Sequence, residues 1–393
     1  MKIRIGVIFG GMTVEHEVSI ISALQAANNF DREKYDIVPI YLSKNNDFYI
    51  GEDIGNIEAY KNIPALLKKS NKVILINEDN KLKLIRYPFK KFGNNELDYI
   101  DVAFPVVHGT NVEDGTLQGY LKTLKIPFAF CDVTSSAVGM DKYIMKTILK
   151  ENDIPVLDCV KCDCKKYRKN PDAFIEKIEK MSGYPVIVKP INLGSSVGIK
   201  KASDRDSLEE ALDYAFQFAK DVLVEKAITN LREINCAVLG DYEEAIASEC
   251  EEPIGSDEIL SYEDKYMSGS KNEGSKGMTD LKRKLPADIP DDVKAEIQTL
   301  AVETFKALGC NGVSRIDFMI DTSENKVYVN EINTTPGSLA FYLWEATGVK
   351  YKDLLDRLVK LALKRERENE NISYSFDTNI LAGVKLGGAK GKL

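Results

Sequence analysis

The chain has 393 residues, which is enough for two or three domains with a sizeable core. Hydrophobic residues make up 44% of it and charged residues 29%, as is usual for globular enzymes. A net charge of −8 without a basic stripe argues against nucleic acid as a partner, and no run approaches the roughly 18 apolar residues of a membrane span. Seven cysteines, an odd number scattered over a long chain, favour reduced thiols in the cytoplasm.

The first segment, residues 1–105, alternates predicted strands and helices. Residues 2–11 predict a strand that runs into a Gly-Gly turn, and residues 15–30 have helical spacing. Further strands are predicted over 35–43 and 97–109, with a hairpin between them over 72–87. The βαβ rhythm favours a parallel sheet with helices on its faces.

Two loops at strand ends of this sheet carry ionisable side chains. Glu15 and His16 lie in the first turn after the Gly-Gly pair, and His108 ends a strand at a glycine. Loops at the carboxyl edge of such a sheet commonly form a ligand cleft. Buried structural histidines are the alternative interpretation.

The second segment, residues 106–222, contains a strand followed by a glycine-serine loop. Lys189 ends the strand, where its ammonium group can reach a phosphate. The backbone N–H groups of residues 194–198 can form a nest for an anion. The usual P-loop pattern is absent, which disfavours a P-loop NTPase.

The third segment, residues 223–365, begins at an apolar strand that carries Glu225 and Lys226 at its end. An extended linker of this kind can present backbone groups to an adenine edge. The long polar stretch over 251–286 is typical of a mobile lid. A strongly amphipathic helix is predicted near residue 360, and the tail over 366–393 is expected to be partly disordered.

Two polar pairs in this segment predict a reactive centre. Arg315 and Asp317 lie two residues apart in one predicted strand, and Glu331 and Asn333 in the next. Residues i and i+2 of a strand share a face, so a hairpin would bring all four side chains together. Their oxygens suit Mg²⁺ carried by a nucleotide phosphate, and the guanidinium suits a phosphoryl or carboxylate group. A solvated polar face is the alternative.

The order and spacing of these motifs resemble the ATP-grasp superfamily, specifically the D-alanine–D-alanine ligase family, over residues 3–365. The runs that carry the resemblance are GGMTVEHEVS, VVHGTNVEDGTLQGYL, MDK, VIVKPINLGSSVG, EKAI, RE, EDKYM, RIDF and NEINTTPG. The resemblance implies an α/β fold of three domains. A Rossmann-like parallel sheet over 1–105 would precede two α+β lobes, 106–222 and 223–365, that clasp ATP.

The resemblance also implies a role for each site residue. ATP phosphates would be held by Lys142, Lys189, Ser195 and Ser196, and adenine and ribose by Glu225, Lys226, Ala227, Ile228 and Glu233. Two Mg²⁺ ions, for which Mn²⁺ could substitute, would be bound by Asp317, Glu331 and Asn333. Glu15 would bind the ammonium of the first amino acid and hydrogen-bond with Ser195 and Tyr266, while Arg315 would stabilise the acyl phosphate and the tetrahedral intermediate. The remaining substrate contacts would be His108, Lys265, Gly337 and Tyr342.

The expected activity is therefore ATP-dependent formation of D-alanyl-D-alanine through an acyl phosphate, for peptidoglycan synthesis, by a cytoplasmic homodimer. One departure leaves the acceptor open. The run SLAFYLWEATG places Tyr342 where the family has a serine that clamps the second substrate. Another D-amino acid, a hydroxy acid or an amine is the alternative acceptor. A non-catalytic nucleotide-binding protein is the third interpretation, against which the full set of lysines, metal ligands and arginine counts.

Overall fold

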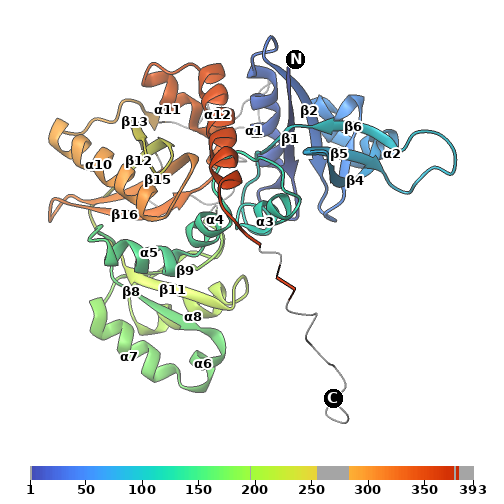
Figure 1. Ribbon diagram of the computed structural model, residues 1–393. Coiled ribbons are helices and arrows are strands. Elements are labelled where there is room, and N and C mark those ends of the chain that lie inside the picture. Colours follow the sequence, from blue (N-terminus) through green and yellow to red (C-terminus); the bar gives the residue numbers. More distant parts are fainter. Residues whose placement is uncertain (1, 195, 255–282, 376–377, 380–393) are drawn as a thin grey trace.

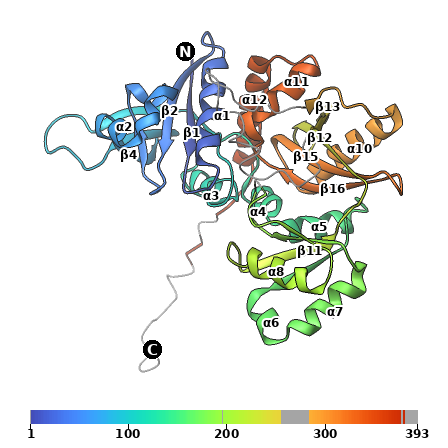
Figure 2. The ribbon, with the colours of Figure 1, turned by 180° about the vertical axis from the view of Figure 1, so that it is seen from behind.

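The computed structural model describes residues 2–194, 196–254, 283–375 and 378–379 (Figures 1 and 2). The predicted catalytic residues Ser195 and Tyr266, together with Lys265, lie outside the described residues, as do most of the expected lid and tail. The described chain forms three sheets, of seven, four and five strands.

The seven-stranded N-terminal sheet has the order β6-β5-β4-β3-β2-β1-β7. Its strands are β1 Ile3–Gly10, β2 Tyr35–Leu42, β3 Phe48–Ile50, β4 Asn71–Glu78, β5 Lys81–Arg86, β6 Glu96–Ile100 and β7 Val102–Pro105. Parallel pairing, as predicted, joins β1 to β2 and β7, and the predicted hairpin is β4–β5. The strands from β2 to β6 pair antiparallel, and the connection between β4 and β5 is too short for a parallel crossover.

Both faces of β1 are buried, since its side chains alternate between two cores. Ile5, Val7 and Phe9 face helix α1 (His16–Asn29), whereas Ile8 faces helix α3 (Thr116–Thr123). A Cβ atom at Gly6 would lie 2.4 Å from the Ile100 side chain, so a larger residue there would have to displace Ile100. Helix α2 (Ile63–Lys69) and the 3₁₀ turns η1 (Glu52–Gly55) and η2 (Ile57–Asn62) lie between β3 and β4.

The central lobe is a four-stranded antiparallel sheet in the order β10-β9-β11-β8. Its elements are α4 Val133–Met140, α5 Lys142–Glu151, β8 Cys159–Asp163, α6 Cys164–Lys169, α7 Pro171–Ser182, β9 Val186–Pro190, β10 Lys200–Ala202, α8 Arg205–Ala215 and β11 Asp221–Lys226. Helices α6, α7 and α8 cover one face, and α5 lies on the other side, toward the C-terminal lobe (Figures 1 and 2). Side-chain caps start the covering helices: Asn170 caps α7, and Asp204 with Ser207 forms a capping box on α8.

The C-terminal lobe is a five-stranded antiparallel sheet in the order β14-β13-β12-β15-β16. Its strands are β12 Leu231–Gly240, β13 Ala245–Pro253, β14 Arg283–Lys284, β15 Gly312–Asp321 and β16 Lys326–Asn333. Helix α10 (Asp291–Ala307) and α5 pack in one core with this sheet. The chain then continues through a short 3₁₀ turn, η4 (Gly337–Ala340), into α11 (Phe341–Ala346) and α12 (Tyr351–Glu370).

Helix α12 packs between the N-terminal sheet and the C-terminal lobe (Figure 1). Its leucines share a core with β1, β7 and β15. On the same helix, the Asp356 carboxylate accepts hydrogen bonds from Lys34 Nζ at 2.8 Å and Tyr35 Oη at 2.9 Å. The predicted amphipathic helix is thus confirmed, and it continues to Glu370. Within the described ranges, no helix has the length and apolar character that crossing a membrane requires.

Three consecutive residues between β16 and α11 adopt the left-handed conformation. Ser338, Leu339 and Ala340 have φ values of 50°, 56° and 49°. Such backbone costs about 1–2 kcal/mol per residue without a compensating contact. Here Ser338 N donates to Ser22 Oγ (2.9 Å) and Ser338 Oγ donates to Gln25 Oε1 (2.6 Å), while Leu339 and Ala340 are fully buried. The N-terminal helix α1 therefore fixes the turn that aims α11.

Candidate active site

The hairpin β15–β16 brings its four polar side chains together, as predicted. Arg315 pairs with Asn333 across the ladder, and Asp317 with Glu331. The Arg315 guanidinium donates two hydrogen bonds to the Asp317 carboxylate, at 2.7 and 2.8 Å, and Asn333 Nδ2 donates to the same group at 3.1 Å. Burial alone would lower the pKa of Arg315, but the neighbouring Asp317 carboxylate holds this pKa well above its ordinary value. The convergence is confirmed; the role of each residue stays a prediction.

A β-bulge at the end of this hairpin adds a residue that the sequence analysis missed. The register steps from Phe318–Val329 to Asp317–Glu331, which leaves Asn330 without a ladder partner. Its Oδ1 accepts a hydrogen bond from Lys189 Nζ at 3.0 Å. The sequence does contain a sign of this bulge. The buried residues of β16 are two positions apart up to Val329, but the next one, Ile332, comes three positions later.

Lysines of the central lobe face this hairpin. Lys142, at the start of α5, places Nζ 3.2 Å from Glu331 Oε2 and donates to the Leu193 carbonyl oxygen at 2.8 Å. One turn later, Lys146 is 2% exposed and lies 2.7 Å from Glu225 Oε2. Lys189 Nζ lies 2.5 Å from the other oxygen of Glu225. Sequence reasoning missed Lys146, although its spacing from Lys142 puts both on one face of α5.

The Glu225 carboxylate is thus held between two ammonium groups. Burial alone would raise its pKa, but Lys146 and Lys189 together lower the pKa of Glu225 to about 2. The other residues predicted to hold adenine and ribose surround the end of β11 and the start of β12. Lys226 is exposed and lies 3.5 Å from Glu324, the buried Ala227 donates its N–H to Pro185 O at 2.9 Å, Ile228 is half-buried and Glu233 is exposed on β12.

Glu15 approaches from the N-terminal sheet, against two glycine-bearing loops. A Cβ atom at Gly109 would lie 2.9 Å from Glu15 Oε2, and one at Gly194 would lie 3.2 Å from it. Gly109 also has a φ of +85°, which favours glycine. The glycines therefore let the Glu15 carboxylate sit directly against backbone from both the N-terminal sheet and the central lobe.

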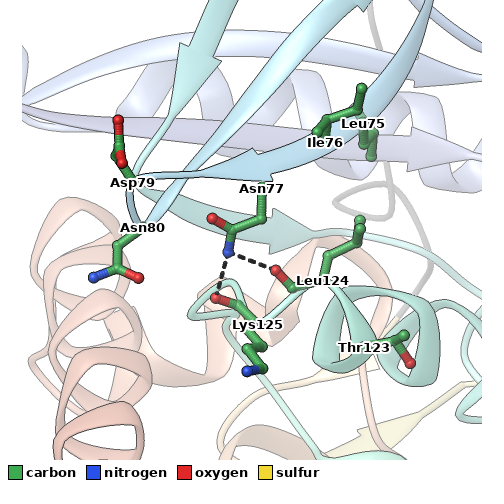
Figure 3. A pocket seen from close by; sticks show the side chains of 8 residues that line it. All are labelled: Leu75, Ile76, Asn77, Asp79, Asn80, Thr123, Leu124 and Lys125. Atoms are coloured by element: carbon green, nitrogen blue, oxygen red, sulfur yellow. Dashed lines mark hydrogen bonds between the residues drawn. The ribbon is translucent and has the colours of Figure 1, made fainter.

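A cavity of about 740 Å³ is lined by residues that directly precede Glu15 and Lys142 in the chain, although not by those two residues themselves. Its lining comes from the loops of the N-terminal sheet and from the central lobe: Met12, Thr13, Val14, Thr110, Asn111, Asp141, Ile191, Asn192, Leu193, Phe218, Ala219, Lys220 and Asp221. A second hollow is lined by residues 75–77, 79–80 and 123–125, where Asn77 Nδ2 donates to the carbonyls of Leu124 and Lys125 (Figure 3). Unlike the cavity above, that second hollow is lined by no chain neighbour of Glu15 or Lys142, so we assign no role in the reaction to it.

Two buried ionisable groups tie the loop after β16 to the N-terminal sheet. Glu113 accepts hydrogen bonds from Gly109 N, Thr334 Oγ1 and Thr335 N, at 2.9, 3.1 and 2.9 Å. His108 uses Nδ1 at Thr335 O (2.8 Å) and Nε2 at Ser22 Oγ (3.0 Å). Burial lowers the pKa of His108 to about 4, while burial and then Glu15 raise the pKa of Glu113 to about 7.

These contacts bear on the predicted substrate role of His108. Both ring nitrogens already have protein partners, and the residue is 4% exposed. The geometry favours an indirect role, in which His108 positions the loop that contains Gly337. The other histidine, His16, is also buried, with its ring nitrogens at Gly11 O (2.7 Å) and Tyr41 Oη (3.0 Å).

Tyr342 lies on α11 at the far side of Arg315. Its phenol donates to Glu251 Oε1 at 2.9 Å, and the Arg283 guanidinium stacks 3.9 Å above its ring. Burial raises the pKa of Tyr342, with Glu251 adding to the effect and Arg315 and Arg283 opposing it. Tyr342 is therefore connected to the polar hairpin through Glu251 and Asn235, and its contact with the second substrate stays a prediction.

The donor set fits a magnesium ion that is carried by phosphate. Among the residues that the structure describes, no three His, Cys, Asp or Glu side chains gather into a group that could hold a metal alone. Asp317, Glu331 and Asn333 instead offer two carboxylates and an amide. That set is typical of Mg²⁺ sites in which nucleotide phosphates and water supply the remaining oxygens.

Three sheets, with lysines of a central lobe facing an acidic hairpin of a C-terminal lobe, define a ligase of the ATP-grasp class. Family models described as D-ala D-ala ligase N-terminus and D-ala D-ala ligase C-terminus match residues 4–131 and 148–360. The chain belongs to the D-alanine–D-alanine ligase family, whose members are ATP-dependent ligases that form a peptide bond.

The chain is similar to individual relatives over nearly its whole length. It is 40% identical to a D-alanine--D-alanine ligase of Thermosipho melanesiensis, covering 98% of this chain and 99% of that one. Among solved structures it resembles the D-alanine-D-alanine ligase from Coxiella burnetii, with a TM-score of 0.77, 30% identity and 94% and 96% coverage. It also resembles the VanG D-Ala:D-Ser ligase from Enterococcus faecalis, with a TM-score of 0.75, 31% identity and 92% and 100% coverage.

Proposed function

We propose that the protein joins two D-alanine molecules into D-alanyl-D-alanine with ATP, as a step of peptidoglycan precursor synthesis for the cell wall. The observation that carries this proposal is the 3.2 Å approach of Lys142 to Glu331, which joins a predicted phosphate contact to a predicted metal ligand. The names of the relatives support D-alanine as the substrate.

The reaction needs an activated carboxylate. The γ-phosphoryl group of ATP passes to the carboxylate of the first D-alanine, which gives ADP and an acyl phosphate. The amine of the second D-alanine attacks the acyl carbon, the bond to phosphate oxygen breaks, and phosphate leaves as the new amide nitrogen loses a proton. Such transfers are catalysed chiefly by positioning and by charge neutralisation.

We assign this neutralisation to residues of both lobes. Lys142 and Lys189 would bind the ATP phosphates, with Glu225 and Asn330 fixing the direction of the Lys189 ammonium group. Arg315 would stabilise the acyl phosphate and the oxyanion that forms on attack. Asp317, Glu331 and Asn333 would hold up to two Mg²⁺ ions, or Mn²⁺ in their place, which supply further positive charge at the phosphoryl group.

Glu15 would bind the ammonium of the first D-alanine. Its carboxylate lies against Gly109 and Gly194, and the residues before it in the chain, Met12 to Val14, line the cavity described above. A half-buried carboxylate among backbone groups is a suitable partner for an ammonium ion, and it would orient the D-alanine carboxylate toward ATP.

We also propose a cellular location and an oligomeric state for the enzyme. All seven cysteines are free thiols, which agrees with a reducing cytoplasm. A homodimer is the assembly we expect, and analytical ultracentrifugation of the purified protein tests it. A sedimenting species of monomer mass at micromolar concentration would contradict the dimer without affecting the reaction.

The activity is tested with purified protein, ATP, Mg²⁺ and D-alanine, by measuring ADP release and the dipeptide by mass spectrometry. We expect D-alanyl-D-alanine in step with ADP. Absence of product from D-alanine would overturn the proposal.

A second candidate is the same reaction with another acceptor. Tyr342 at the acceptor side and the likeness to a D-Ala:D-Ser ligase support it. Competition between D-alanine, D-serine and D-lactate, read as product masses, separates the two. Product from D-serine or D-lactate in excess over the dialanine product would favour the second candidate.

A further inference from the structure

A row of polar side chains crosses four strands of the C-terminal sheet. Glu251 on β13 is the register partner of Asn235 on β12, Asn235 is the partner of Asp317 on β15, and Asp317 is the partner of Glu331 on β16. Register partners in antiparallel strands project to the same face. The row therefore continues from the predicted metal ligands past Arg315 to Glu251.

Glu251 collects three donors at the far end of this row. Its carboxylate accepts hydrogen bonds from Asn235 Nδ2 at 3.0 Å, Arg283 Nη1 at 3.0 Å and Tyr342 Oη at 2.9 Å. The Arg283 guanidinium also stacks on the Tyr342 ring at 3.9 Å from its centroid. Glu251 and Tyr342 thus hold Arg283 from two sides, through an ion pair and through a ring contact.

Stabilisation of the fold does not by itself account for the contacts among Glu251, Arg283 and Tyr342. Glu251 is 4% exposed, and a buried ion pair is often no more stabilising than apolar residues of the same volume. The second ion pair of the row, Arg315 with Asp317, lies beside it. Arg315 and Arg283 both lie near the Tyr342 phenol, and two guanidinium groups near one another suit the binding of an anion.

The order of groups along the row fits the geometry of the reaction. Phosphate and metal belong at the Glu331 end, because Lys142 approaches there. The reacting carbonyl belongs at Arg315. The acceptor attacks through its amine, so its carboxylate, one carbon further on, must lie beyond Arg315 on the side of Arg283.

We propose that Arg283, positioned by Glu251 and Tyr342, recognises the carboxylate of the acceptor amino acid. The inference rests on the proposed function and adds a residue to it. A guanidinium presents its N–H donors as a planar fork that matches a carboxylate, and the bond from Arg283 Nη1 to Glu251 helps to fix the direction of that fork.

The test compares two acceptors, D-alanine and D-alaninamide, which differ in the acceptor carboxylate. D-Alanine serves as donor in both cases, and products are resolved by mass. The wild-type enzyme should prefer D-alanine as acceptor, and Arg283→Met should lower that preference by about tenfold or more, since a buried charged contact is lost. The KM for ATP should change less than about twofold, because the phosphate contacts lie at the other end of the row.

Conservative variants separate positioning from folding. Arg283→Lys keeps the charge without the fork, and Tyr342→Phe keeps the ring without the bond to Glu251, so each should show a smaller loss of preference than Arg283→Met. Glu252→Gln and Arg232→Met are the matched controls. Their residues form an ion pair of 2.8 Å on the neighbouring position of β13, and both variants should retain the wild-type preference.

The outcomes distinguish the two proposals. If wild-type protein makes no dipeptide from D-alanine, the proposed function fails. If it makes the dipeptide and Arg283→Met keeps the wild-type preference, the assignment of Arg283 alone is overturned. Should Arg283→Met fail to fold, unchanged preference in both Arg283→Lys and Tyr342→Phe would overturn it equally.

Discussion

Glu331 connects the two lobes through a single carboxylate. It faces Asp317 across the hairpin and lies 3.2 Å from Lys142 of the central lobe. Replacement by Gln keeps the shape of the side chain and removes its charge, so the contribution of that charge to metal and lysine binding can be measured directly.

We predict that Glu331→Gln lowers turnover by at least about tenfold and raises the Mg²⁺ concentration required for half-maximal rate, because a hard divalent ion loses a charged ligand. ADP release measured across a Mg²⁺ titration checks this. Glu296→Gln is the control, since Glu296 is an exposed carboxylate on helix α10 of the same lobe. Wild-type rates at low Mg²⁺ in Glu331→Gln would refute the assignment.

His108 makes stability depend on pH in a defined direction. Its pKa is lowered by burial from 6.5 to about 4 in the native protein, so the unfolded chain binds more protons between these two values. The contribution of His108 to stability is therefore present above pH 6.5 and is lost as pH falls toward 4. Glu113, with its pKa raised to about 7, has the opposite sign: its contribution is lost as pH rises from 4.5 toward 7.

We predict that His108→Gln flattens the acid side of the stability curve. One group can change the free energy of unfolding by up to about 1.4 kcal/mol per pH unit, and the variant lacks this contribution between pH 6.5 and 4. Urea unfolding of both proteins at several pH values checks the slope, and Glu113, present in both, cancels in the comparison. Identical slopes in the two proteins would contradict the prediction.

At the scale of elements, helix α5 presents lysines to the site from one face. Lys142 and Lys146 are one turn apart and reach carboxylates on different lobes, Glu331 and Glu225. The helix is held in this direction because Asp141 caps its first turn through Tyr143 N and Ile144 N, at 3.0 and 2.9 Å.

We predict that Lys146→Met destabilises the protein, by less than the roughly 3–5 kcal/mol of a broken buried ion pair, because Glu225 keeps Lys189. Lys150→Met is the control: Lys150 lies on the next turn of α5, where it pairs with Asp158 at the surface. Thermal unfolding should show a lower midpoint for Lys146→Met and little change for Lys150→Met. Equal midpoints would show that the Lys146–Glu225 pair contributes nothing to stability.

The sequence predicts elements whose pattern is local. The hairpin β15–β16 and its polar face follow from alternation within twenty-odd residues, and so do the hairpin β4–β5 and helix α1. The Lys146–Glu225 pair joins different elements of the central lobe, so no spacing in the sequence predicts it. Apart from the β4–β5 hairpin, the antiparallel part of the N-terminal sheet has no local pattern that predicts its pairing: β3 has only three residues, and β3 and β4 pair antiparallel although a helix lies between them.

The sequence also does not predict side-chain positions that depend on an unusual backbone conformation. Three left-handed residues in a row, Ser338 to Ala340, are unfavourable for L-amino acids and depend on contacts with α1, more than three hundred residues away. The surroundings of Tyr342 follow from that turn. The departure of the 338–348 run from its family pattern could be recognised, but its partners Glu251 and Arg283 could not.

On the scale of the whole molecule, α12 connects the C-terminal lobe to the N-terminal sheet through Asp356. Burial alone would raise the pKa of Asp356, but hydrogen bonds from Lys34, Lys360 and Tyr35 lower this pKa to about 2. The contribution of this carboxylate to stability is therefore present above about pH 4 and is lost as pH falls toward 2.

We predict that Asp356→Asn lowers the free energy of unfolding at pH 7 by about 1–3 kcal/mol, because Lys34 and Tyr35 lose a charged acceptor. The difference from wild type should shrink as pH falls toward 2. Asp353→Asn, an exposed position one turn earlier on α12, should cost clearly less. Chemical denaturation of the three proteins at pH 7 and pH 3 measures both effects; a wild-type curve for Asp356→Asn at pH 7 would contradict the prediction.

The bond from Lys34 to Asp356 spans 322 positions of sequence, which has a consequence for synthesis. While the ribosome is still translating the lobes, the nascent N-terminal sheet lacks the helix that covers part of its apolar face. We expect truncated chains that end before Tyr351 to associate with chaperones or aggregate, even though their own strands are intact. Supplying α12 as a separate peptide should restore their solubility, because the missing surface is a single helix.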